Sequence, residues 1–161
     1  MTQDEIRAMF EYEPATGLLR RIDAKARKPY PWRGIGKGRR YLAHTATDGV
    51  IYLHQAVWLY HHGYVPAMLD HVNGDTRGNR IENLRECTNA QNQYNVPRKS
   101  NNTHGHKGVV FHRACRSRPW QAKIVASGKV ISLGYHATKE EAAAAYAVGA
   151  AKYAGEFART N

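Results

Sequence analysis

Four polar residues in the middle of the chain have types and spacings that could carry out metal-assisted hydrolysis. Asp70 and His71 are adjacent, Asn83 follows the histidine by twelve residues, and Asn92 comes nine residues later. Imidazole titrates near neutral pH, so His71 could take a proton from water. Carboxylate and amide oxygens are hard ligands that suit Mg²⁺ or Mn²⁺. Together these groups match the needs of phosphodiester hydrolysis: an activated water, a cation, and help for the departing oxygen.

The expected role of each side chain follows from its chemistry. We predict that His71 is the general base, and that the side-chain oxygen of Asn83 accepts its other ring N–H and fixes the tautomer. Because neighbouring strand residues point to opposite faces, Asp70 need not compete with the base and can hold the metal, with Asn92 as the second ligand. Asn79 is the closest alternative to Asn83, and the twelve-residue spacing favours Asn83.

The segments around these residues resemble a known family. HVNGD, NRIENLR and TNAQN, with the spacings above, are similar to the HNH endonucleases of phages and homing elements over about His54 to Asn95. The resemblance implies a metal-dependent DNA endonuclease that hydrolyses phosphodiester bonds, nicks duplex DNA and uses one divalent cation, with the same roles at the four positions. Other branches of the family have a further histidine ligand where Asn92 stands, which favours Mg²⁺ or Mn²⁺ over Zn²⁺ or Ni²⁺.

Other interpretations of this segment stay open. It could be an Asn- and Gly-rich loop without metal, a decayed HNH domain in a non-catalytic sequence-specific DNA-binding protein, or a nonspecific nuclease or toxin. The intact set of four residues argues against decay, and the segment that follows argues against a nuclease without sequence preference. We interpret Asp75 as a turn residue rather than a further carboxylate of the site, and His54 as structural or helix-capping.

The pattern around the motif predicts the elements that position it. A strand over 67–71, a polar loop, a strand over 83–87 and a helix over 89–95 follow in that order, and Thr88 with Gln91 forms a capping box for the helix. Before the motif we expect a helix over 2–12, a strand over 18–22, a basic loop over 25–38 that can reach DNA, a hairpin of 39–45 with 49–53, and a helix over 54–62.

The last sixty residues have a separate pattern of three strands and one helix. We predict strands over 108–113, 119–126 and 129–134, with a two-residue turn at Ser127-Gly128, and a capped helix from Thr138 to Ala154. Alternation along these strands gives one apolar face, which should bury against the alanine-rich helix, and one polar face, which stays open. The face assignment makes Trp120 a core residue rather than a base-stacking one.

This C-terminal pattern resembles the APETALA-type, or ethylene-response-factor-like, DNA-binding domain. The matching segments are HKGVVFHR, PWQAKIVASGK and ISLGYHATKEEAAAAYAVGAAKYAGEFARTN. The resemblance implies that the sheet lies in the major groove of duplex DNA with the helix packed behind it. Across the chain, the residues expected to contact DNA are His112, Arg113, Arg116, Arg118, Gln121, Lys123 and Ser132, with Lys107, Arg80 and Arg85.

The charge distribution favours a polyanionic partner. The chain carries a formal net charge of +11, and residues 24–47 and 87–139 contain seven and nine basic residues, respectively, without an acid. Phosphates would neutralise such stretches, so we expect double-stranded DNA as the partner, bound by a monomer. RNA is disfavoured because the sheet lacks exposed stacked aromatics. We expect no membrane association and no small-molecule cofactor beyond the metal.

The two cysteines and the overall pattern complete the expectations. Cys87 and Cys115 form no C-x-x-C pair, which excludes a zinc ribbon and indicates a reducing cytoplasmic setting, in a bacterial host cell if the chain is phage-encoded. The fold class expected is α+β: a ββα-metal (His-Me finger) nuclease core plus a three-stranded antiparallel sheet packed on one helix. The nuclease domain is placed at 1–95 with its motif core at 67–95, the linker at 96–103, and the DNA-binding domain at 104–161.

Overall fold

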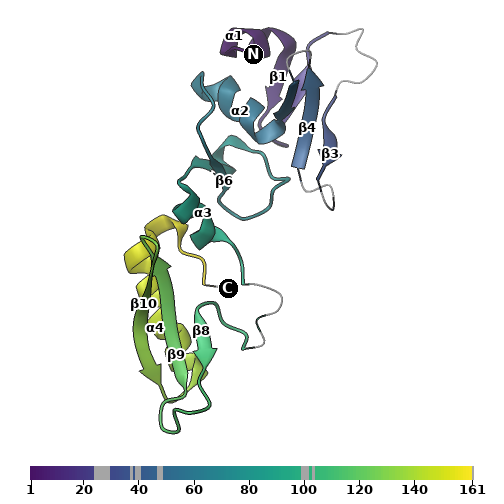
Figure 1. The fold of residues 1–161 in the computed structure, drawn as a ribbon. Coiled ribbons are helices and arrows are strands. Elements are labelled where there is room, and N and C mark those ends of the chain that lie inside the picture. The colour runs from purple at the N-terminus through teal and green to yellow at the C-terminus, as the bar shows by residue number, and fades with distance from the viewer. Residues whose placement is uncertain are drawn as a thin grey trace. The chain divides into compact units, whose positions relative to one another are not determined.

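The computed structural model describes residues 1–23, 30–36, 38, 41–46, 49–98, 102 and 104–160. Within these ranges the chain forms a mixed α and β structure of four α-helices and several small antiparallel sheets (Figure 1). It divides into two compact units, Met1–Cys87 and Thr88–Asn161, each described below by itself. The domain boundaries expected from the sequence stay predictions. They place residues 88–95 in the N-terminal domain, whereas this division places the same residues in the second unit.

The first unit begins with a short capped helix and a hairpin. Helix α1 (Gln3–Met9) has the capping box of Thr2 with Glu5 at its start, as such a sequence pattern predicts. The helix ends earlier than the expected residue 12, because Phe10 begins strand β1 (Phe10–Glu13), which pairs antiparallel with β2 (Leu18–Arg21). Backbone pairing with β2 therefore overrides the helical periodicity of this segment.

A second sheet and the longest helix of the first unit follow. Strands β3 (Arg33–Ile35), β4 (Tyr41–Ala46) and β5 (Gly49–Tyr52) form an antiparallel sheet in the order β3-β4-β5. The sequence predicted the β4–β5 hairpin but assigned β3 to the basic loop; residues 24–29, 37, 39–40 and the turn residues 47–48 lie outside the described ranges. Helix α2 (Leu53–His62) follows and ends at Gly63, whose φ of 82° is the left-handed conformation expected at this position.

The motif hairpin is anchored in the core of this unit. Strands β6 (Leu69–His71) and β7 (Leu84–Glu86) pair antiparallel, and the 3₁₀ turn η2 (Ile81–Asn83) leads into β7. Leu84 belongs to the core with residues of α1, β1, β2 and α2, namely Ile6, Phe10, Leu19, Leu53, Ala56, Val57, Trp58 and Leu59. One buried side chain thus ties the short hairpin to the larger elements.

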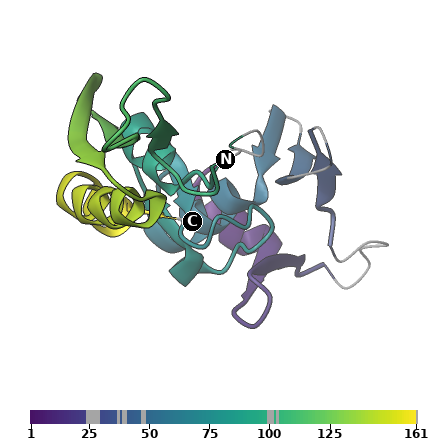
Figure 2. The ribbon, with the colours of Figure 1, turned by 90° about the horizontal axis from the view of Figure 1, so that it is seen from below.

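The second unit contains the predicted sheet and helix. It consists of α3 (Asn89–Asn95), β8 (Val109–Phe111), β9 (Trp120–Ala126), β10 (Lys129–His136), α4 (Lys139–Ala154) and the turn η3 (Gly155–Phe157). The sheet order is β10-β9-β8, and α4 packs along it (Figures 1 and 2). The apolar face meets the helix as alternation predicts, with a core of Val109, Ala122, Ile124, Ala142, Tyr146 and Ala150.

Local turn and cap chemistry in the second unit largely matches the sequence. Ser127 and Gly128 have φ values of 50° and 74°, the left-handed pair that joins β9 to β10 in a tight turn. Thr138 caps α4 by accepting from the backbone N–H of Glu141, whereas the carboxylate of Glu141 accepts from Ala137 N, one residue before the expected position. Trp120 is half-buried and packs against the core, as predicted.

Candidate active site

The β6–β7 hairpin presents Asp70 and His71 as two buried polar groups side by side. Each of the two residues is only 5% exposed. The register pairs Asp70 with Arg85 and His71 with Leu84, so the aspartate shares its face with a basic residue and the histidine shares its face with a core residue. Strand alternation thus separates the carboxylate from the imidazole, as the sequence predicted for two groups with different roles.

The imidazole of His71 is held by Asn79. Its Nε2 lies 3.1 Å from Oδ1 of Asn79, a residue that is only 1% exposed. The amide of Asn79 is oriented by its own Nδ2, which donates to the carbonyl of Arg77 at 2.9 Å. Because that bond turns Oδ1 toward the histidine, Nε2 carries the hydrogen in the neutral ring and the lone pair is on Nδ1.

The predicted partner of His71, Asn83, has a different place in the structure. Its Oδ1 accepts from the backbone N–H of Asn73 at 3.1 Å, and its Nδ2 donates to the carbonyl of Gly78 at 2.5 Å. The backbone carbonyl of Asn83 also accepts from Val72 N at 2.9 Å. Asn83 thus joins both ends of the loop between the two strands, and the contact that the twelve-residue spacing assigned to it belongs to Asn79.

The loop itself is built from short-range turns. Asp75 N donates to Oδ1 of Asn73 at 2.8 Å, and Arg77 N donates to Oδ1 of Asp75 at 3.0 Å. These bonds are typical of side chains that replace backbone acceptors in tight turns. They agree with the interpretation of Asp75 as a turn residue.

The β1–β2 hairpin of the same unit supports this loop from behind. The hydroxyl of Tyr12 accepts from Ile81 N at 3.0 Å, and the guanidinium of Arg80 donates to the carbonyl of Ala15. Gly17, at a φ of 71°, passes so close that a Cβ there would lie 2.4 Å from the carbonyl carbon of Asn79. The segment that holds His71 is therefore packed against backbone that precedes it by about sixty residues.

His54 is the second imidazole of the site. It is the second residue of α2, and its ring centroid lies 5.4 Å from that of His71 in an edge-to-face arrangement. The rings of Tyr41 and Tyr52 lie 5.7 and 5.5 Å away. Burial, followed by the charge of His71, lowers the pKa of His54 from 6.5 to about 4. A neutral ring thus faces the imidazole of His71; from the sequence, we interpret His54 as structural or helix-capping, and the sequence contains no signal for this contact.

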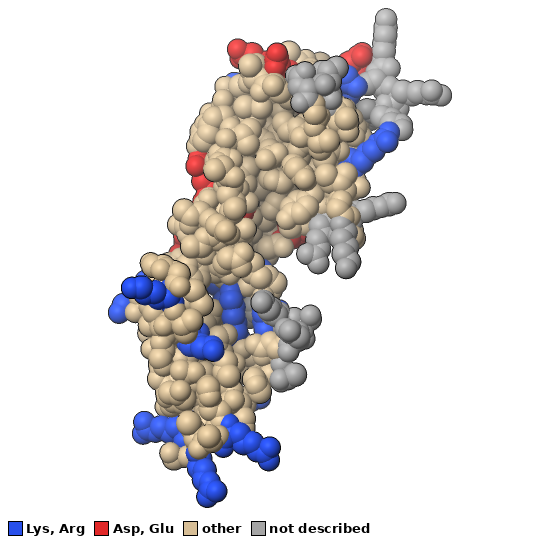
Figure 3. All heavy atoms as spheres, viewed as in Figure 1, with Lys and Arg blue, Asp and Glu red and all other residues tan. Residues whose placement is uncertain are grey.

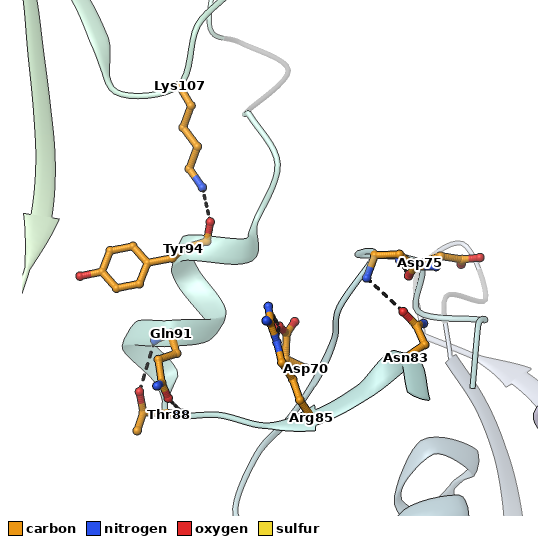
Figure 4. A network of polar contacts seen from close by, with 9 residues as sticks. Asp70, Asp75, Asn83, Arg85, Thr88, Gln91, Tyr94 and Lys107 are labelled. Atoms are coloured by element: carbon orange, nitrogen blue, oxygen red, sulfur yellow. Dashed lines mark hydrogen bonds and ion pairs between the residues drawn. The ribbon is translucent and has the colours of Figure 1, made fainter. Parts of the chain in front are cut away.

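Asp70 forms an ion pair with Arg85 across the hairpin. Nε and Nη2 of the arginine lie 3.0 and 2.8 Å from the same carboxylate atom, Oδ2 (Figure 4). The side chains are 6% and 14% exposed, respectively. Arg85 and Arg80 were both expected to contact DNA; in the structure their guanidinium groups bind Asp70 and Ala15 of the same unit.

The metal ligands expected from the sequence are a carboxylate and an amide. Among the described residues, no group of three or more His, Cys, Asp or Glu side chains is arranged to hold a metal ion. Asp70 has the hard oxygen donors that Mg²⁺ and Mn²⁺ prefer, and it already neutralises a cationic group, the guanidinium of Arg85. Asn92 lies half-buried on α3 of the second unit, and its role as a ligand stays a prediction.

The open face of the second unit's sheet carries a polar ladder, formed by His112, Gln121 and Ser132. Nε2 of His112 lies 2.9 Å from Oε1 of Gln121, and Nε2 of Gln121 donates to Oγ of Ser132 at 3.2 Å. Lys123 is directly opposite Ser132 in the β9–β10 register. The structure thus brings together these four residues, which the sequence predicted as DNA contacts.

The other four residues of this unit that the sequence predicted as DNA contacts differ in exposure and in hydrogen bonding. Arg113, Arg116 and Arg118 are exposed in the β8–β9 loop, and Figure 3 shows basic side chains gathered at this end of the unit. Lys107 instead donates to the carbonyl of Tyr94 at 2.6 Å (Figure 4) and to that of Val96 at 2.7 Å. Burial, followed by the charge of Arg159, lowers its pKa. Lys107 therefore closes the end of α3 rather than reaching outward.

The family comparison matches the part of the chain that contains this site. Residues 51–94 match the family model of the HNH endonucleases. A search of the curated proteins and of the solved structures finds no match. The family match supports nuclease activity with DNA as the substrate, and it covers α2, the β6–β7 hairpin and most of α3. Among the described residues, no helix has the length and apolarity needed to cross a membrane.

Proposed function

We propose that the protein is a metal-dependent DNA endonuclease that hydrolyses phosphodiester bonds and nicks duplex DNA. The observation that carries this proposal is the buried pair of His71 and Asn79 within the segment that matches the HNH endonucleases. A buried histidine whose tautomer is fixed by an oriented amide is the arrangement that a general base needs. The adjacent buried carboxylate of Asp70 supplies the second group that the reaction requires.

His71 acts on the attacking water through Nδ1. Asn79 accepts the Nε2–H, so the lone pair of the neutral ring is on the other nitrogen. When Nδ1 takes a proton from water, the imidazolium that forms keeps its hydrogen bond to Oδ1 of Asn79 and is stabilised by it. The neutral ring of His54 keeps a second positive charge away from the imidazolium.

Asp70, with Asn92, would hold one divalent cation, Mg²⁺ or Mn²⁺. A bound cation of this kind supplies charge neutralisation at the scissile phosphate and helps the 3′ oxygen to leave. The donor chemistry suits it, since a carboxylate and an amide both offer hard oxygens. The position of Asp70 on the strand face opposite His71 keeps the base from competing for the cation.

The second unit would bind double-stranded DNA through its open sheet face. Its resemblance to the APETALA-type domain, the polar ladder and the three exposed loop arginines support this assignment. A ribbon of strands fits the major groove, where Gln121 and Lys123 could meet base edges while the arginines meet phosphates. Selection of DNA by this unit and hydrolysis by the HNH segment make a site-directed nuclease, active as a monomer that nicks one strand.

Supercoiled plasmid tests the proposal directly. Purified protein with Mg²⁺ or Mn²⁺ should convert the plasmid to open circles, and EDTA should abolish the conversion. Linear product formed at the same rate would contradict the nicking mode. Intact plasmid with either metal, under conditions where the protein binds the same DNA in a gel-shift assay, would contradict the nuclease and favour a DNA-binding protein with an inactive HNH segment.

A further inference from the structure

The ion pair between Asp70 and Arg85 occupies the carboxylate to which the proposed function assigns the metal. Nε and Nη2 of Arg85 donate to Oδ2 of Asp70 at 3.0 and 2.8 Å. The register places the two residues directly opposite each other on β6 and β7, so the hairpin itself brings the two charges together. Any cation that binds Asp70 meets a positive charge already in place.

We propose that Arg85 is an exchangeable counter-cation: it neutralises Asp70 until the divalent cation binds, and it then binds a phosphate of the DNA. The inference rests on the proposed function, because it takes Asp70 as the metal ligand. It adds a role for Arg85 that couples two binding events. The coupling makes the protein bind the metal weakly by itself and tightly together with DNA.

The burial of the pair explains why the exchange requires DNA. The side chains of Asp70 and Arg85 are 6% and 14% exposed, so neither charge is well solvated. A partly buried charge without a counter-charge is strongly unfavourable. When a cation of charge +2 takes the carboxylate, the carboxylate, cation and guanidinium together carry a charge of +2. An anion is then needed at this point, and a phosphate meets the need because it fits the planar guanidinium through two hydrogen bonds.

The neighbouring acid on the same hairpin cannot replace DNA as the anion. Glu86 accepts from the hydroxyl of Tyr64, and it follows Arg85 on the strand, so it points to the opposite face. The phosphate oxygens that approach the cation during hydrolysis are therefore the natural new partner of Arg85. By linkage, DNA must raise metal affinity by the same factor by which the metal raises DNA affinity.

A permanent structural ion pair is the competing explanation, and metal binding separates the two. Both explanations predict that removing Arg85 lowers stability, because a buried carboxylate is left without its partner. Only the exchange predicts that removing Arg85 raises the affinity of the protein for the metal alone. Charge is the cause of this competition, so Arg85→Lys should keep the wild-type affinity for the metal alone, whereas Arg85→Gln should raise that affinity.

The test measures Mn²⁺ binding to the full chain by electron paramagnetic resonance, without DNA. We expect Arg85→Gln to bind Mn²⁺ about tenfold more tightly than wild type, since a competing cation is gone. Arg85→Lys should stay near the wild-type affinity. Asp70→Asn should abolish Mn²⁺ binding, both in the wild-type background and together with Arg85→Gln. If Arg85→Gln is too unstable for titration, its melting temperature should rise more with Mn²⁺ than that of Arg85→Lys does.

A second titration adds a short DNA duplex in the His71→Ala background, which keeps the DNA intact. The duplex should tighten Mn²⁺ binding about tenfold with Arg85 present and much less with Arg85→Gln. Equal Mn²⁺ affinity of wild type and Arg85→Gln would overturn the exchange and leave the nuclease proposal standing. Absence of Mn²⁺ binding by every variant would overturn the exchange, and the metal site of the proposed function with it.

Discussion

Oδ1 of Asn79 lies 3.1 Å from Nε2 of His71, and the same amide donates through Nδ2 to the carbonyl of Arg77 at 2.9 Å. The first bond selects the tautomer of the imidazole, and the second prevents the amide from turning over. The loop that carries Asn79 is closed by a different asparagine, Asn83. Two amides close together in sequence therefore have separate partners: Asn79 binds the imidazole of His71, and Asn83 binds the backbone of the loop.

Replacing the two asparagines should separate these tasks. Asn79→Ala removes the acceptor of the imidazolium and should lower the rate of plasmid nicking by about 10- to 100-fold. Asn83→Ala leaves the N–H of Asn73 and the carbonyl of Gly78 without their partner, so it should lower the free energy of unfolding by about 1 kcal/mol or more. Both variants are compared in plasmid nicking at saturating metal and in urea unfolding. A larger loss of nicking rate for Asn83→Ala than for Asn79→Ala would contradict these separate roles.

Gly17 should not tolerate a side chain, because the loop between β6 and β7 packs directly against it. In Gly17→Ala the new Cβ would meet backbone atoms of Asn79 and Arg80 at 2.3–2.7 Å. Gly36→Ala is the matched control, since Gly36 also has a positive φ, 79°, and no atom of the described residues lies within 4 Å of its Cβ position. The control should cost only about 1 kcal/mol of backbone strain. Gly17→Ala should cost at least twice as much in urea unfolding and should slow nicking; equal costs would argue against the contact.

His54 should make stability depend on pH. Its pKa is about 4 in the folded protein and 6.5 as the ordinary value, so between these pH values the unfolded chain binds the extra proton. The contribution of the neutral His54 ring to the free energy of unfolding is fully present above pH 6.5. Roughly 3 kcal/mol of it is lost as the pH falls toward 4. His54→Phe keeps an aromatic ring beside Tyr41 and Tyr52 and should remove this part of the pH dependence. Unfolding curves of both proteins between pH 4 and 7 measure the difference, and parallel pH profiles would contradict the assignment.

The β8–β9 loop should account for part of the salt dependence of DNA binding. Arg113, Arg116 and Arg118 are all exposed, and each phosphate contact contributes close to one unit to the slope of log affinity against log salt. Replacing all three by Ala should reduce the slope by about 2 to 3. Lys152→Ala, on α4 where Lys152 lies over the ring of Tyr153, is the control and should change it little. An unchanged slope in the triple variant would place the DNA elsewhere on the protein.

Local signals in the sequence predicted most of the elements of both units. Capping residues Thr2 and Thr88 begin helices as expected, and the left-handed pair Ser127-Gly128 joins two strands. These features depend on a few adjacent residues, so their chemistry can be read directly from the chain. The end of α1 could not be read in this way, because the choice of strand at Phe10 depends on its pairing with Arg21, eleven residues away.

The spacing in the sequence selected the candidate site residues, but it did not predict their contacts. The spacing identified Asp70 and His71, which share a buried hairpin strand. It assigned the partner of His71 to Asn83, because spacing does not show how the loop of residues 72–79 turns back on itself. The pairing of Asp70 with Arg85 depends on the strand register, and the approach of His54 depends on the packing of α2, so neither contact has a signature in the sequence.

The central claim is that His71 is the general base of a metal-dependent nuclease. The most direct measurement compares the rate of plasmid nicking by wild type, His71→Ala and His62→Ala at saturating Mg²⁺ or Mn²⁺. His62 is an exposed histidine of the same unit and serves as the matched control. We predict that His71→Ala lowers the rate by about 10²- to 10⁴-fold with unchanged binding of DNA, while His62→Ala stays near wild type. Nicking by His71→Ala at the wild-type rate would contradict the account.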